Sequence, residues 1–192
     1  MLKTLSLAVA VFGFAAILSA QTAAPGPDTF KVGYFSYANT PGAPDGTVRV
    51  TNVGTNITTP GSGNLCAMIY VFEPDQQMAE CCGCLVTPDG LRTLSIDANL
   101  TNNPLTPVTL TTGAIKIVSS SGAAGGCNAA KPTPVTGIRA WGTHIQAAGV
   151  VTETEFVDST LSAGELALLK NKCSSIQSNG SGFGICSCGI GD

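Results

Sequence analysis

Eight cysteines constrain the fold of this chain more than any other feature of its sequence. They are Cys66, Cys81, Cys82, Cys84, Cys127, Cys173, Cys186 and Cys188. In a chain that leaves the cytoplasm, an even number of cysteines indicates disulfide bonds, because the receiving compartment is oxidising. The pairing stays open, since eight cysteines allow 105 arrangements. Each bond would contribute ~2–4 kcal/mol, so four would rival the ~5–15 kcal/mol net stability of a domain.

The first twenty residues carry the pattern of an export signal. Lys3 is their only charge, residues 5–18 are largely apolar, and small residues precede Gln21. A short positive end, an apolar middle and a small-residue exit are typical of a secretory signal peptide. A membrane-spanning helix needs ~20 apolar residues, more than this segment offers. We therefore expect residues 1–20 to be a signal peptide, cleaved near Ala20 or a few residues later.

The remaining chain has the length and charge of one extracytoplasmic domain. Removing 20 of the 192 residues leaves 172, in which eight basic residues face twelve acidic ones without a basic cluster. That pattern argues against a nucleic-acid partner and against an anionic membrane surface. We expect residues 21–28 to be a flexible leader and residues 29–192 to be a single disulfide-bonded, β-rich domain. After cleavage it would be extracellular or periplasmic, without membrane insertion.

Short runs of β-branched and aromatic residues, separated by Gly, Pro, Asn and Asp, predict a mainly β fold. The expected strands are residues 29–37, 47–53, 65–73, 91–97, 114–119, 137–146 and 150–157. The third run is apolar almost throughout, which indicates a central strand. Pro-Asp-Gly occurs at residues 44–46 and 88–90, and these residue types predict two tight turns.

One helix is predicted near the C-terminus. Ser162 and Glu165 have capping-box spacing, in which each side chain accepts from a backbone N–H of the first turn. The apolar stripe that follows is Leu166, Leu169, Cys173 and Ile176, with Lys170 and Lys172 pointing elsewhere and Asn179-Gly180 at the end. A disulfide from Cys173 would therefore fix the helix to the sheet. We expect its partner to be Cys186 or Cys188, which are near in sequence.

Two resemblances bear on the fold. Residues 46–54 resemble an early strand of bacterial immunoglobulin-like modules. With seven short strands, this implies an immunoglobulin-like or related β-sandwich with one C-terminal α-helix, stabilised by disulfides. A second resemblance rests on motifs at residues 66–75, 80–84, 86–91, 179–182 and 186–188. These motifs resemble uncharacterised small secreted, cysteine-rich bacterial proteins of acidobacterial type, and that resemblance implies no activity.

The cluster at residues 80–84 is the most unusual motif. Adjacent Cys81 and Cys82 are expected to bond different partners, because a bond between them would strain the intervening peptide. The cluster would then be a loop that holds two or three disulfides. The alternative is a thiolate metal site, since zinc favours the C-x₂₋₄-C spacing that Cys81 and Cys84 satisfy. Cys186 and Cys188 would supply further thiolates, but export favours disulfides, so we expect no metal and no cofactor.

His144 is the only histidine, so any Ser-His-acid or Cys-His catalysis must use it. A hairpin turn at residues 147–149 would place His144 opposite Thr152 and leave Glu153 and Glu155 on the other face. We therefore expect a half-exposed structural histidine and no catalytic residue.

Two pairs of carboxylates and a group of aromatic residues remain. Glu73 with Asp75, and Glu153 with Glu155, could serve a glycosidase, although i,i+2 spacing is also ordinary on a solvated sheet face. Aromatic residues could stack on sugar; they are Trp141 beside Arg139, with Tyr34, Phe35 and Tyr37. Core packing is the alternative for each.

The sequence therefore predicts a secreted, non-enzymatic structural or binding module of the cell envelope or extracellular space, whose partner could be a carbohydrate or an envelope protein. One alternative is a small secreted hydrolase that uses a carboxylate pair on polysaccharide. The other is a thiolate metal-binding protein.

Overall fold

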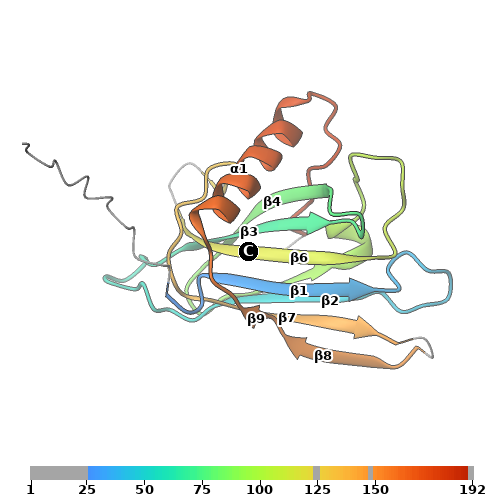
Figure 1. The fold of residues 1–192 in the computed structure, drawn as a ribbon. Helices are drawn as coiled ribbons and strands as arrows, with labels where there is room; N and C mark the ends of the chain where they lie inside the picture. The colour runs from blue at the N-terminus through green and yellow to red at the C-terminus, as the bar shows by residue number, and fades with distance from the viewer. Residues whose placement is uncertain (1–25, 123–125, 147–148, 190–192) are drawn as a thin grey trace, which may run out of the picture.

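A computed structural model describes residues 26–122, 126–146 and 149–189. Two β-sheets pack against each other, and one helix lies on the outer face of the larger sheet (Figure 1). The predicted mainly β fold with one C-terminal helix is thereby confirmed. The predicted signal peptide, residues 1–20, and residues 21–25 of the predicted leader lie outside the described residues. In the described part of the chain, no helix is long and apolar enough to cross a membrane.

The elements follow one another along the chain as strands, with one π-helical turn in the middle and the α-helix at the end. They are β1 (Phe30–Ser36), β2 (Thr47–Asn52), β3 (Leu65–Phe72), β4 (Met78–Val86), β5 (Leu91–Ser95), η1 (Ile96–Leu100), β6 (Thr112–Ser121), β7 (Ile138–Ile145), β8 (Val151–Glu155), β9 (Val157–Asp158) and α1 (Ala163–Ser178).

The strands form a five-stranded sheet of order β4-β3-β6-β1-β9 and a four-stranded sheet of order β5-β2-β7-β8. Every pairing of these strands is antiparallel. Three of the pairs are nested along the chain, because β1 pairs with β6, β2 with β5, and β3 with β4. Most contacts therefore join distant parts of the sequence, which is typical of slow-folding β topologies.

The core has two parts, one on each side of the larger sheet. Every residue of β3 is buried, which confirms the predicted central strand between β4 and β6. Its residues alternate between the two faces, as side chains in a strand must. Leu65, Ala67, Ile69 and Val71 pack toward the second sheet, whereas Cys66, Met68, Tyr70 and Phe72 pack on the helix side.

The cysteine cluster at residues 80–84 is a strand and not the predicted loop. It forms the middle of β4, the edge strand of the larger sheet. Alternation turns Cys82 and Cys84 into the core between the sheets and Cys81 toward the helix. Adjacent cysteines can therefore reach different partners without strain in the peptide between them.

All eight cysteines form disulfide bonds. The pairs are Cys66–Cys127, Cys81–Cys173, Cys82–Cys186 and Cys84–Cys188. The prediction for Cys173 was wrong, because Cys173 forms its disulfide with Cys81 on β4 and not with Cys186 or Cys188. Its predicted role holds, since this bond joins α1 to the sheet. The sulfurs of Cys82, Cys84 and Cys188 lie within 4.8 Å of one another because two of the bonds are adjacent, but as disulfides they are not the thiolates that a zinc site requires.

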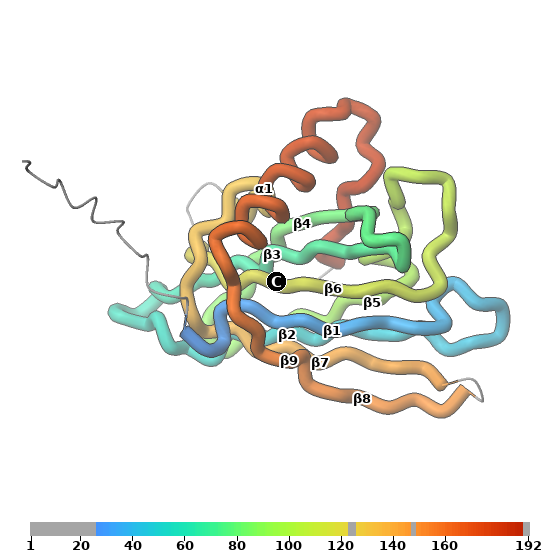
Figure 2. The backbone as a smooth tube through the Cα atoms, in the orientation of Figure 1, coloured from blue at the N-terminus to red at the C-terminus, as the bar shows by residue number. Residues whose placement is uncertain are grey.

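The C-terminal segment covers the free edge of β4 (Figure 2). The backbone N–H of Cys81 donates to the carbonyl of Gly184 at 2.9 Å, and a parallel bridge joins Cys81 to Ile185. In this register Cys186 and Cys188 face their partners on β4. An uncovered edge strand invites pairing with other chains, and the tail covers this edge at Cys81.

The predicted strand at 150–157 is divided into β8 and β9 at Phe156. The Phe156 side chain is buried, and a Cβ built on Gly33 or on Gly142 would lie 2.5 Å from its ring. Both glycines are therefore required for the ring to fit between β1 and β7. The division sends β8 into the smaller sheet and β9 into the larger one.

One of the two predicted Pro-Asp-Gly turns is confirmed. The N–H of Gly90 donates to the carbonyl of Thr87 at 2.9 Å, although the positive φ falls on Asp89. Residues 44–46 form no turn, because the turn lies just before them, where Ala43 donates to Thr40.

Candidate ligand-binding groove

The helix covers only part of the outer face of the larger sheet. Ser162 caps its first turn, accepting from the N–H of Glu165 at 3.0 Å as predicted. The Glu165 carboxylate does not complete the predicted capping box, since it binds the ammonium of Lys116 on β6 at 2.7 Å. The bond from Cys173 holds α1 over β4, where Leu169 and Ile176 are buried beside it. The outer face of β6 and β1 is left partly open.

A groove of about 630 Å³ occupies this open part, between α1 and the ends of β1 and β3. Its lining residues are Tyr34, Phe72, Glu73, Pro74, Gln76, Gly113, Ala114, Lys116, Leu168 and Lys172. The lining is mainly apolar, and the volume lies in the ~300–1,000 Å³ range of small-molecule sites. Leu168 of α1 and Tyr34 of β1 are both exposed large apolar residues. The groove therefore offers apolar surface that no part of the described chain covers.

Two ammonium groups lie over the aromatic ring of Phe72 in this groove. Lys116 Nζ is 4.9 Å from the ring centroid and Lys172 Nζ is 5.8 Å from it. At these distances an aromatic face attracts a cation. Lys172 lies off the buried stripe of the helix, as predicted, but the sequence did not show that its ammonium reaches the groove.

Glu73 is the single carboxylate among the described residues that line the groove. Its Oε1 accepts from the hydroxyl of Thr106 at 3.1 Å. Asp75, its predicted catalytic partner, instead accepts from the N–H and the side-chain amide of Gln77 and so stabilises the turn after β3. Glycosidases require two carboxylates on either side of the scissile bond. The predicted pair is therefore not brought together in the groove, where Glu73 alone of the two lines it.

The second predicted carboxylate pair lies on β8, in the other sheet, and both of its members are in ion pairs. Glu153 pairs with Arg49. Glu155 pairs with Arg139 at 3.1 Å and lies 4.0 Å from the ammonium of Lys31. Both carboxylates therefore have structural partners.

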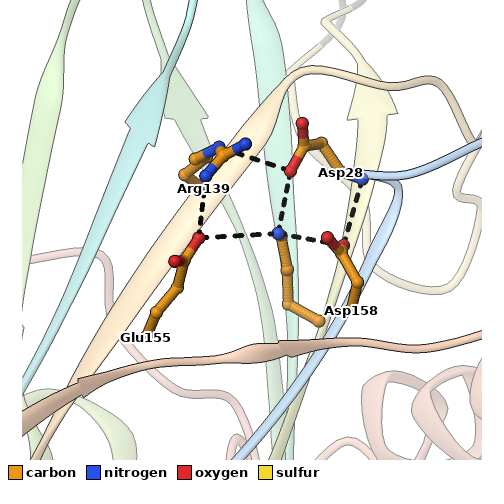
Figure 3. A network of polar contacts seen from close by, with 5 residues as sticks. Asp28, Arg139, Glu155 and Asp158 are labelled. Atoms are coloured by element: carbon orange, nitrogen blue, oxygen red, sulfur yellow. Dashed lines mark hydrogen bonds and ion pairs between the residues drawn. The ribbon is translucent and has the colours of Figure 1, made fainter.

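The buried ammonium of Lys31 is the centre of an ion network with partly exposed partners, which the sequence did not reveal. Figure 3 shows Asp28, Arg139, Glu155 and Asp158 in this network. The Lys31 ammonium forms ion pairs with the carboxylates of Asp28 at 2.8 Å and Asp158 at 2.9 Å. The Asp28 carboxylate also pairs with the guanidinium of Arg139 at 3.5 Å. The network joins the start of β1 to β7, β8 and β9. Burial opposes the charge on Lys31, but its hydrogen bonds to Asp28 and Asp158 outweigh that cost and raise its pKa. These ion pairs connect residues of several strands, so they help to join the two sheets.

His144 is buried and not half-exposed as predicted. The predicted register is confirmed, since His144 lies opposite Thr152 and Trp141 opposite Glu155. Its Nε2 lies 2.6 Å from the hydroxyl of Thr154, and its ring stacks on Tyr34 at 4.0 Å. Burial lowers the pKa of His144, so the neutral form is favoured near pH 7. Tyr34 also lines the groove, so the His144 ring contacts one of its wall residues.

The predicted aromatic residues do not gather at one sugar-binding surface. Phe35 is buried in the core between the sheets, and Tyr37 lines a separate hollow near Ile145. Trp141 lies on the smaller sheet beside the ion network. Only Tyr34 reaches the groove.

Glu80 is a second buried ionisable group that the sequence analysis missed. It lies on β4 with no exposed surface, and its Oε1 accepts from the N–H of Asn103 at 2.9 Å. Its Oε2 is buried and has no hydrogen-bond partner among the residues that the structure describes. Burial raises the pKa of Glu80 to about 7, since the cost of desolvation exceeds the benefit of that single hydrogen bond.

Comparisons of this chain with protein-family models, with curated proteins and with solved structures found no match. The function must therefore be inferred from the site itself.

Proposed function

We propose that this protein is a secreted, non-enzymatic binding module that holds a small apolar ligand in the groove between α1 and the five-stranded sheet. The open, mainly apolar lining of that groove is the observation that supports it. The proposal retains the predicted cell-envelope or extracellular location, the immunoglobulin-like assignment and the resemblance to secreted cysteine-rich bacterial proteins.

Secretion is supported by two independent features. The first twenty residues have the pattern of a signal peptide. Four disulfides indicate an oxidising, extracytoplasmic environment.

A binding role fits how the groove is built. Its helical wall is fixed by the Cys81–Cys173 bond and its opposite wall by the stacking of Tyr34 on His144. Walls held in this way lose little conformational entropy when a ligand binds, which improves affinity. A small apolar ligand bound in the groove would cover the exposed side chains of Leu168 and Tyr34.

The test is fluorescence titration with N-phenyl-1-naphthylamine, a neutral probe that becomes bright in apolar sites. Leu168→Asp should weaken binding about tenfold or more, because it removes an apolar contact and adds a charge that must be desolvated. Ala167→Asp is the matched control: it adds the same charge at the adjacent exposed position, outside the groove, and should bind like the wild type. No binding by the wild type, or equal binding by the two variants, would contradict the proposal.

A further inference from the structure

The two lysines of the groove differ in how their charges are balanced. Lys116 is paired with Glu165 at 2.7 Å, and both side chains are mostly buried. Among the described residues, Lys172 forms no ion pair, and its hydrogen-bond partner is the backbone carbonyl of Gln76 at 3.4 Å. Lys172 is thus the groove cation whose charge is not compensated by a carboxylate.

The surroundings of Lys172 favour an anion at this point. Its ammonium lies over Phe72, whose ring attracts the cation but carries no counter-charge. Lys172 is also half-buried, so an ion pair formed there would be less screened by water than one on the open surface. Glu73, engaged by Thr106, adds one negative charge to the lining and so disfavours ligands with several negative charges.

We propose that the groove selects a small organic monoanion, with an apolar or aromatic body over Phe72 and Leu168 and a carboxylate or sulfonate at Lys172. This inference rests on the proposed binding function and specifies its ligand class. The volume of about 630 Å³ suits a small molecule and is too small to enclose a folded partner. Charge complementarity at Lys172 is what distinguishes this class from neutral apolar compounds.

A matched pair of probes tests this. 8-Anilinonaphthalene-1-sulfonate has the same aromatic body as N-phenyl-1-naphthylamine and adds one sulfonate. Lys172→Met should weaken binding of the sulfonate probe about fivefold and leave the neutral probe within twofold, because only the ion pair is lost. Added salt should weaken the sulfonate probe in the wild type and have little effect in the variant. Near-ultraviolet circular dichroism confirms that each variant is folded.

Lys170→Met is the matched control, since Lys170 lies on the same helix, is exposed and does not line the groove. It should change neither affinity. Equal losses for both probes in Lys172→Met, or no loss for either, would overturn the anion preference while leaving the groove as a binding site. If the wild type binds neither probe, the proposed function itself fails, and the two failures are thereby distinguished.

Discussion

The two edges of the five-stranded sheet are closed in different ways. At β4, three disulfides attach α1 and the C-terminal segment to one strand. At the opposite edge, the two-residue strand β9 pairs with β1, and the ion network around Lys31 holds the junction (Figure 3). Covalent bonds stabilise one edge and electrostatics the other. The first should depend on redox conditions and the second on pH and salt.

The groove lies between these two edges, with one wall toward each. Its helical wall is fixed through the Cys81–Cys173 bond at the β4 edge. Its other wall includes Tyr34 of β1, the strand whose start is held by the ion network. We therefore expect loss of the Cys81–Cys173 bond to weaken probe binding as well as stability, whereas changes elsewhere at the two edges should affect the free energy of unfolding.

The largest effect should come from the bond that fixes α1. Replacing Cys81 and Cys173 together by Ala should lower the free energy of unfolding by about 2–5 kcal/mol, because a long loop is released in the unfolded chain. It should also weaken binding of N-phenyl-1-naphthylamine, since α1 forms one groove wall. Urea unfolding and probe titration measure the two effects.

The matched control for this prediction removes another long-range disulfide. Replacing Cys66 and Cys127 together by Ala should cost a similar amount of stability but preserve probe binding, because that bond does not hold α1. If both double variants retain binding, the Cys81–Cys173 bond does not build the groove.

The next effect concerns the electrostatic edge. Lys31→Met should lower the free energy of unfolding by about 2–3 kcal/mol, because Asp28 and Asp158 lose the ammonium between them, although water solvates these partly exposed carboxylates in part. Urea unfolding of this variant is compared with Lys131→Met at an exposed position, which should stay within about 0.5 kcal/mol of the wild type. A negligible loss in Lys31→Met would show that the network does not stabilise the edge.

At the edge held by disulfides, a change at Glu80 of β4 is expected to raise the free energy of unfolding, by a smaller amount. The folded-state pKa of Glu80, about 7, lies above its ordinary value, so the folded protein favours the protonated carboxyl. The stability that this proton contributes is present at low pH and is lost as pH rises through about 7. Glu80→Gln should therefore stabilise the protein by about 1–3 kcal/mol at pH 8.5, where it removes a buried charge with an unpaired oxygen. At pH 5 the gain should largely vanish, and thermal unfolding at both pH values measures the difference. An equal gain at both would contradict the assigned protonation.

The smallest effect belongs to Asp158, which is partly exposed. Burial opposes its charge, but hydrogen bonds from Lys31 and from the backbone of Asp28 outweigh this and hold its pKa below the ordinary value. Its contribution is therefore present above about pH 4, the unfolded pKa, and is lost as pH falls through the lower folded value. Asp158→Asn should cost less than about 1 kcal/mol at pH 7 and nothing in strong acid, as measured by unfolding across pH. A constant difference would exclude a role for its charge.

The parts of the fold that the sequence predicts are those with a local signal. The apolar run of β3, the N-cap Ser162 and the register of His144 opposite Thr152 all follow from spacing and residue type. Strand β4 was missed because Gly and Glu are depleted in strands and because its adjacent cysteines were interpreted as a loop of disulfides. Its central residues are buried from both sides by distant segments, so the sequence there shows no alternation. The division at Phe156 depends on Gly33 and Gly142, which are far away in the chain.

The groove could not be predicted because its residues come from β1, β3, β6 and α1. Phe72, Lys116 and Lys172 are unremarkable in the sequence, and only the tertiary fold brings them together. The predicted disulfide partner of Cys173 was wrong for a related reason. Proximity in sequence favoured Cys186 or Cys188, whereas the fold places β4 directly beneath the helix.

Mapping of the disulfides tests the central claim that β4 holds both the helix and the tail. Trypsin cleaves after Lys172 and chymotrypsin after Phe183, so digestion of the unreduced protein separates Cys173 from Cys186 and Cys188. Mass spectrometry should find both C-terminal peptides bonded to the peptide that contains Cys81 and Cys82. A direct bond between the Cys173 peptide and the tail peptide, or free thiols in either one, would contradict the account.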